Sequence, residues 1–245
     1  MTATLSETAL ARASLTSIIP EAELLQGLSR RRPWITQFLI DGRPVGGEYP
    51  AYADAAIDQF FESFPDARSV LELGSLEGSH TFALARHPGD RHVLAVEGRE
   101  YNVEKARFVQ RATGVHNVQF VRGDLEELDL TAFGRFEAIF CSGLLYHLPE
   151  PWKLVKRLSE LSDNLFIRTH YALESNVNML ANGFPGYKFP ESGYNDPCSG
   201  LSPSSFWPTL EGLQHLLAVN GFPFVTILED FQHRGGRMVA LAARR

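Results

Sequence analysis

Short apolar runs alternate with amphipathic segments through the middle of the chain. The apolar runs cover residues 69–73, 92–96, 118–121, 138–141 and 165–167, and segments with helical spacing lie between them at 79–86, 101–112 and 151–161. This alternation is typical of strands and helices that build a parallel sheet. The runs show no inside–outside polarity, which indicates strands buried on both faces. The pattern therefore predicts an α/β fold with helices on both faces of the sheet.

The first 64 residues follow a different pattern and predict an N-terminal helical extension or cap. Polar helices are expected from Ser6 to Leu28 with a break at Pro20, and Pro50 opens a further helix. The buried face of that helix is marked by apolar residues three and four apart, namely Ala53, Ile57, Phe60, Phe61 and Phe64. Residues 65–245 then form the main domain.

Residues 171–205 have no long periodic run, and aromatic residues stand among Asn, Gly, Pro and Ser. A loop this long in a compact domain usually has a function, so we predict a lid-like insertion over an acceptor pocket. Its candidate contacts are Tyr187, Phe189, Tyr194 and Trp207. A helix is expected from Phe206 to Leu217, and the runs at 224–228 and 238–242 predict an antiparallel hairpin at the sheet edge.

The strand at 70–73 ends in a glycine turn that runs into a helix. Backbone N–H groups at such a turn bind ligands. A dinucleotide would require glycines where Leu76 and Ser79 stand, and Glu72 would place a negative charge beside its phosphates. Neither objection applies to a cationic cofactor that has no phosphate. The turn therefore favours such a cofactor over NAD(P) or a flavin.

The segment Glu72-x-Gly74-x-x-x-Gly78 resembles motif I of the class I, Rossmann-like S-adenosylmethionine-dependent methyltransferases. Acids follow the next two strands at Glu97 and Asp124, and the segment from Cys141 to His147 resembles motif IV of that family. The resemblance implies a mostly parallel seven-stranded sheet with an antiparallel edge strand, and S-adenosylmethionine as cofactor. The implied cofactor-binding residues are Glu72, Gly74, Ser75, Gly78, Glu97, Gly98, Asp124, Leu125, Cys141 and Ser142.

A narrower resemblance, through the segment from Ser142 to Pro149, joins the chain to tRNA wobble-uridine modifying enzymes and small-molecule tailoring methyltransferases. We expect an oxygen or nitrogen of a small-molecule acceptor to be methylated. His147 and His170 are the candidate catalytic bases, since both follow strands on the ligand side. A tRNA-modifying enzyme and a non-catalytic methyltransferase-like subunit stay open as alternatives.

Composition and charge restrict the partners and the location. The formal net charge of −6 disfavours nucleic acid as a partner, and the run Arg30–Arg32 is the one candidate basic patch. Two cysteines far apart predict no disulfide framework, and the histidines and acids lack metal-ligand clustering, so no metal is expected. Neither a signal peptide nor a membrane-spanning run is recognised, which predicts a cytoplasmic protein. A homodimer stays open.

Overall fold

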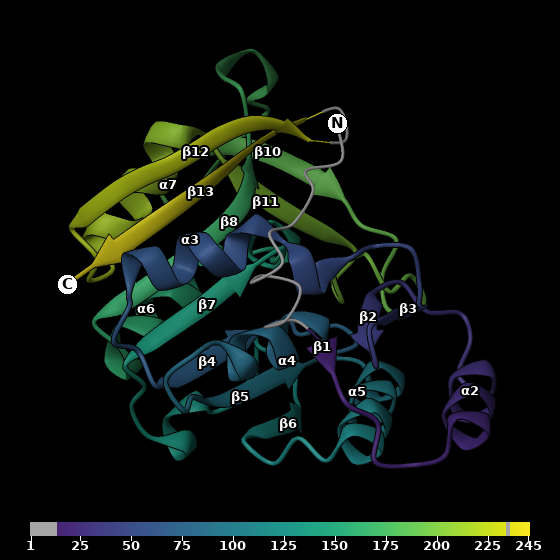
Figure 1. The fold of residues 1–245 in the computed structure, drawn as a ribbon. Coiled ribbons are helices and arrows are strands. Elements are labelled where there is room, and N and C mark those ends of the chain that lie inside the picture. The colour runs from purple at the N-terminus through teal and green to yellow at the C-terminus, as the bar shows by residue number, and fades with distance from the viewer. Residues whose placement is uncertain (1–13, 234–235) are drawn as a thin grey trace.

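The computed structural model describes residues 14–233 and 236–245, and a seven-stranded sheet forms its centre (Figure 1). The spatial order is β12-β13-β8-β7-β4-β5-β6, and every pair from β8 to β6 is parallel. Strand β13 runs antiparallel to both of its neighbours, which places the antiparallel strand one position inside the edge. The predicted fold class is confirmed. The bounds are β4 (Ser69–Leu73), β5 (His92–Glu97), β6 (Val118–Arg122), β7 (Ala138–Ser142), β8 (Asn164–Tyr171), β12 (Phe224–His233) and β13 (Gly236–Arg244).

Helices cover both faces of this sheet, because successive strand residues point to opposite sides. In β7, Phe140 packs into the apolar cluster that contains residues of α3, α4 and α5, while Ile139 and Cys141 pack into the cluster that contains residues of α6 and α7. Both clusters are buried, which explains the continuous apolar runs in the strand sequences. The helices are α3 (Ala55–Ser63), α4 (Ser79–Arg86), α5 (Glu100–Thr113), α6 (Pro151–Leu161) and α7 (Leu210–Val219).

The N-terminal extension adds a small sheet to the predicted helices. Strands β1 (Ser14–Leu15), β2 (Gln37–Ile40) and β3 (Arg43–Gly46) form it, and α2 (Glu21–Ser29) lies between β1 and β2. The first part of the helix expected from Ser6 falls on residues 6–13, outside the described residues. The helix expected at Pro50 begins with a 3₁₀ turn, Ala51–Ala53, and continues as α3.

The expected loop at 171–205 is largely a second antiparallel sheet. Its strands are β9 (Met179–Ala181), β10 (Phe184–Pro190) and β11 (Ser204–Pro208). Strand β11 takes Phe206, so the predicted helix is shorter and α7 begins after the N-cap Thr209. The sequence did not reveal these strands because Gly and Pro interrupt β10 and only two of its seven residues are buried. Residues 191–203 remain as a loop between β10 and β11.

Residues 14–233 and 236–245 contain neither a membrane-spanning helix nor a cluster of metal ligands. No helix there has the length and apolar character needed to cross a bilayer. No group of three or more His, Cys, Asp or Glu side chains there could hold a metal ion.

Candidate active site

A cavity of about 230 Å³ lies at the carboxyl ends of β4, β5, β6 and β7. The loop after β4 forms part of its wall, with a φ of 73° at Gly74 and 88° at Gly78. A Cβ atom at Gly74 would lie 3.0 Å from the Leu144 side chain. The glycines therefore allow a tight turn into α4 that brings Gly74, Ser75 and Leu76 to the cavity wall.

Glu97 ends β5 and lines the cavity with a fixed carboxylate. Its Oε2 accepts a hydrogen bond from the backbone N–H of Leu76 (2.9 Å), and its Oε1 accepts one from the backbone N–H of Arg99 (2.9 Å). Burial raises the pKa of Glu97, and these backbone hydrogen bonds oppose that shift. Oε1 also accepts from the Asn102 amide (3.3 Å), so the carboxylate is held in place and Oε2 is the oxygen that retains a lone pair for a ligand hydroxyl.

Two buried hydroxyls on the cavity wall have no hydrogen-bond partner within the described residues, Ser75 Oγ and Ser142 Oγ. A buried hydroxyl without a partner costs stability, so two such groups in residues of the cavity wall favour a ligand that supplies the missing hydrogen bonds. Asp124 lies at the same wall, where its Oδ1 accepts the Glu126 N–H at 2.9 Å. The cavity is therefore polar on several sides.

Seven of the predicted cofactor positions line this cavity and three lie behind its wall. Glu72 is 1% exposed, and burial raises its pKa to about 7. Burial also raises the pKa of the Cys141 thiol to about 12. Gly78 is the left-handed N-cap of α4. The seven lining positions are Gly74, Ser75, Glu97, Gly98, Asp124, Leu125 and Ser142.

A network around Asp54, which the sequence analysis did not predict, closes another side of the cavity. Arg168 from β8 donates to both carboxylate oxygens of Asp54, while the phenol of Tyr49 and the ring of His80 contact Oδ2. Burial alone would raise the pKa of Asp54, but the contacts with His80 and Arg168 hold it well below the usual range. Tyr49, His80 and Arg168 line the cavity.

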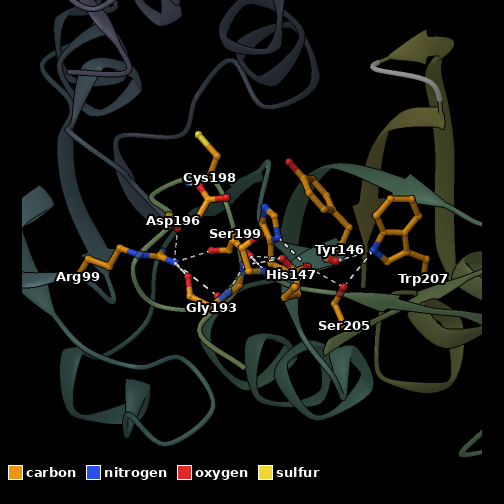
Figure 2. A network of polar contacts seen from close by, with 12 residues as sticks. Arg99, Tyr146, His147, Gly193, Asp196, Cys198, Ser199, Ser205 and Trp207 are labelled. Carbon is orange, nitrogen blue, oxygen red and sulfur yellow. Dashed lines mark hydrogen bonds and ion pairs between the residues drawn. The ribbon is translucent and has the colours of Figure 1, made fainter. Parts of the chain in front are cut away.

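Arg99 holds the loop 191–203 with several hydrogen bonds from its guanidinium (Figure 2). Its guanidinium donates to backbone oxygens of the loop, which include those of Asp196 (2.8 Å) and Ser199 (2.7 Å). The fork of donors suits several carbonyls at once. The loop thus lies over the Glu97 side of the cavity, where Pro197, Cys198, Ser199, Gly200 and Leu201 form part of the wall.

A second cavity of about 750 Å³ adjoins the first. Both are lined by the same five residues, Tyr146, His147, Cys198, Ser199 and His233. The outer cavity combines aromatic rings with polar side chains, which include Asn176, Asp196, Glu191, Gln232 and Arg237. A molecule in this cavity would therefore border on a molecule in the first.

Trp207 lines the outer cavity, but its ring is already stacked on other rings of the protein. Its ring lies between those of His170 (4.9 Å between centroids, 11°) and Phe189 (4.5 Å, 13°). Its Nε1–H donates to the backbone oxygen of Tyr146 at 2.7 Å. Tyr194 lies away from the outer cavity, over the guanidinium of Arg99. Tyr187 and Phe189 do line the outer cavity.

The two predicted catalytic histidines have different surroundings. His147 lies in the 3₁₀ turn Leu145–His147 after β7 and lines both cavities, and its Nδ1 contacts Glu191 Oε1 at 3.0 Å. His170 lines the outer cavity but not the first one. Its Nδ1 donates to the backbone oxygen of Arg237 at 3.0 Å. Of the two histidines, His147 is therefore the one that lies at the junction of the cavities.

Comparison with known proteins identifies related sequences and structures. A family model described as "Methyltransferase domain" matches residues 70–164. The N-terminal domain of EvdMO1, solved with SAH bound, is 31% identical with a TM-score of 0.83, and the alignment covers 92% of this chain and 97% of that domain. A second structure of that domain was solved in the presence of SAH and D-fucose, with 33% identity and the same TM-score and coverage.

Two curated relatives match over shorter stretches. A tRNA (guanine-N(7)-)-methyltransferase of Corynebacterium jeikeium is 31% identical over 102 residues, which is 41% of this chain. A tRNA U34 carboxymethyltransferase of Desulforapulum autotrophicum is 24% identical over 164 residues, which is 66% of this chain. The matches span 38% and 46% of the lengths of these relatives, and this chain covers 47% of complete EvdMO1.

Proposed function

The chain belongs to the class I S-adenosylmethionine-dependent methyltransferases, and from that membership we propose that it methylates a hydroxyl group of a small polar molecule, with a sugar as the favoured acceptor. The observation that carries the proposal is the junction of the two cavities at His147. An acceptor in the outer cavity meets a basic side chain where that cavity borders the first.

The first cavity fits S-adenosylmethionine. The carboxylate of Glu97 can accept hydrogen bonds from ribose hydroxyls, and the unpartnered hydroxyls of Ser75 and Ser142 suit the polar end of an amino acid. Leu76 stands where a dinucleotide site requires glycine. When bound, S-adenosylmethionine supplies an electrophilic methyl group on a cationic sulfur.

His147 has the position of a general base in this proposal. The acceptor oxygen gains the methyl group and releases its proton to the ring of His147, and the electron pair of the broken carbon–sulfur bond stays on sulfur. The protein contributes chiefly by positioning, because the displacement requires no covalent intermediate. The loop 191–203 helps to exclude water from the junction.

The outer cavity supports a sugar-like acceptor. Asn176 and Gln232 can both donate and accept hydrogen bonds, Asp196 accepts, and Arg237 donates. Such a mixture suits a ring that bears several hydroxyls. The similar EvdMO1 domain was crystallised in the presence of D-fucose, which agrees with this choice.

A tRNA acceptor is the second candidate, since both curated relatives are tRNA-modifying enzymes by name. The formal net charge of −6 argues for the small molecule, because binding to nucleic acid depends on phosphate neutralisation. Within the arginine run, the Arg31 guanidinium lies 4.1 Å from the centroid of the Phe108 ring and donates to the backbone oxygen of Gly27. The run therefore does not present three cations in one row.

Transfer of a radiolabelled methyl group tests the proposal. The purified chain is incubated with labelled S-adenosylmethionine and either a panel of monosaccharides that includes D-fucose or total tRNA. We expect label in a sugar, and we expect His147→Ala to lower that rate about 100-fold while S-adenosylmethionine affinity stays within about twofold. The matched control is His116→Ala at an exposed histidine, which leaves the rate unchanged. Label in tRNA alone would contradict the sugar acceptor, and cofactor binding without any transfer would favour a non-catalytic subunit.

A further inference from the structure

Glu191 is a buried carboxylate that joins His147 to the loop 191–203. Its side chain is 2% exposed, and each oxygen accepts two hydrogen bonds. Oε1 is bound by His147 Nδ1 (3.0 Å) and Ser205 Oγ (2.7 Å). Oε2 is bound by Ser199 Oγ (2.6 Å) and the backbone N–H of Gly200 (2.7 Å). Figure 2 shows the surroundings of this carboxylate, with His147, Ser199 and Ser205 labelled.

The direction of each of these hydrogen bonds is fixed by the neighbouring groups. Ser199 Oγ accepts the backbone N–H groups of Ser192 (2.7 Å) and Gly193 (3.2 Å), so its own hydrogen is directed to Glu191. Ser205 Oγ accepts the indole N–H of Trp207 at 3.2 Å, and its hydrogen is likewise directed to Glu191. Burial alone would raise the pKa of Glu191, but hydrogen bonds from His147, Ser199 and Gly200 lower it to about 2. The group is therefore an ionised acceptor.

An ionised carboxylate has no proton to give, so Nδ1 of His147 must carry the hydrogen between them. The neutral ring then has its lone pair on Nε2, the nitrogen that can accept a proton. We propose that Glu191 is the positioning residue of the active site, which holds His147 in the tautomer whose Nε2 is basic. This inference rests on the proposed role of His147 as the base.

The same carboxylate links the base to closure of the loop. Its Oε2 holds Ser199 and Gly200, whose backbone oxygens also accept from the guanidinium of Arg99. The 191–203 loop thus supplies the group that sets the tautomer. An open loop would leave His147 without its partner.

Substitution of Glu191 by glutamine tests the proposal through the position of a single proton on the His147 ring. The Gly200 N–H can only donate, whereas the Ser205 hydroxyl can turn to accept and the His147 ring can move its proton, so the amide oxygen of a glutamine occupies the Oε2 position. Its NH₂ group then faces Nδ1 of His147 and requires that atom to accept. We expect Glu191→Gln to transfer the ring proton from Nδ1 to Nε2.

Long-range ¹H–¹⁵N correlation spectra of the whole chain distinguish the two tautomers, with His147→Gln used to assign the signals. We expect an Nδ1–H ring in the wild type and in Glu191→Asp, and an Nε2–H ring in Glu191→Gln. An Nε2–H ring in the wild type would overturn the proposal even if Glu191→Gln failed to fold. So would the same tautomer in the wild type and a folded Glu191→Gln.

Turnover provides the second measurement. We expect Glu191→Gln to lower kcat by about 100-fold or more, because a wrong tautomer removes the base. The dissociation constant for S-adenosylmethionine stays within about twofold, and Glu191→Asp recovers most of the rate. The control Glu174→Gln, at an exposed position in the neighbouring 3₁₀ turn, retains wild-type kcat.

The two measurements separate this inference from the proposed function. The tautomer is read without any acceptor, so it is informative even if no sugar is methylated. A changed tautomer with unchanged kcat would show that His147 is not the base, and it would overturn the catalytic role of Glu191 together with that of His147.

Discussion

The carboxyl group of Glu72 is 1% exposed and lies behind the cavity wall, with one oxygen unpartnered within the described residues. Burial raises its pKa to about 7 from an ordinary value of 4.5, although the nearby His80 opposes the shift. As pH rises from 4.5 to about 7, the unfolded chain therefore releases this proton before the folded protein does. Glu72 thus contributes stability at low pH that is lost over this interval.

Glu72→Gln should remove this loss, because an amide does not ionise. We expect the variant to exceed the wild type in free energy of unfolding at about pH 8, by on the order of 3 kcal/mol, and to match it near pH 4.5. Urea unfolding at both values measures the difference. An equal offset at the two pH values would contradict the assignment.

At the scale of single residues, the sequence predicted the site residues that follow strand ends. It did not predict the pairs of side chains that meet across the fold. Glu97 and Asp124 follow strand ends, so the topology of a parallel sheet brings them to one edge. Asp54 and Arg168 are 114 residues apart in the chain. Glu191 lies in a segment without periodicity, and its contact with His147 spans 44 residues. No local pattern marks such pairs.

Arg99 determines how the loop 191–203 is held. The guanidinium donates to backbone oxygens of Gly193, Tyr194, Asp196, Ser199 and Gly200, and the residue is 6% exposed. A lysine at this position would keep the charge and lose the fork. The loop would then keep only part of its connection to α5 and β5.

We therefore expect Arg99→Lys to loosen this element without unfolding the sheet. Hydrogen exchange of amides in residues 193–200 should accelerate at least about tenfold, while amides of β4 and β7 keep their protection. Arg122→Lys, a substitution at a 58% exposed arginine, is the matched control. Unchanged exchange in Arg99→Lys would show that the loop is held by its own packing.

Among the elements, the buried parallel strands were the most predictable. Val70 and Leu71 point to different apolar clusters, so the strand does not alternate with solvent-facing positions, and its one acid, Glu72, is itself buried. Strand β10 gave no such signal, because Pro185 and Gly186 lie within it and its order comes from pairing with β9 and β11. The small sheets therefore depend on tertiary contacts that the local sequence does not encode.

For the whole molecule, Glu77 connects the N-terminal extension to the main domain. Its side chain is 0% exposed and pairs with Lys105 Nζ at 2.7 Å. It also accepts the backbone N–H groups of Ile35 and Thr36. Glu77 lies between Leu76 and Gly78, so the same residue fixes the extension against the loop at the cofactor cavity.

Glu77→Gln should consequently destabilise the protein and weaken cofactor binding together. The variant leaves Lys105 as a buried charge without its partner, so we expect a loss of about 3 kcal/mol or more in the free energy of unfolding. Chemical denaturation measures it, and titration with S-adenosylmethionine should show a reduced affinity. Glu150→Gln, which breaks the exposed pair with Lys153, should change stability by less than about 1 kcal/mol. A small effect at both sites would mean that the extension is held by apolar packing alone.

The cysteine arrangement has a practical consequence. Cys141 is buried and its pKa is raised to about 12, so maleimides and similar electrophiles would find little thiolate there. Cys198 is exposed and lies in the loop that borders both cavities. Cys198 is thus the thiol that a spin label or dye would modify in the natural chain. A label there reports movement of the loop 191–203 beside the two cavities without any substitution.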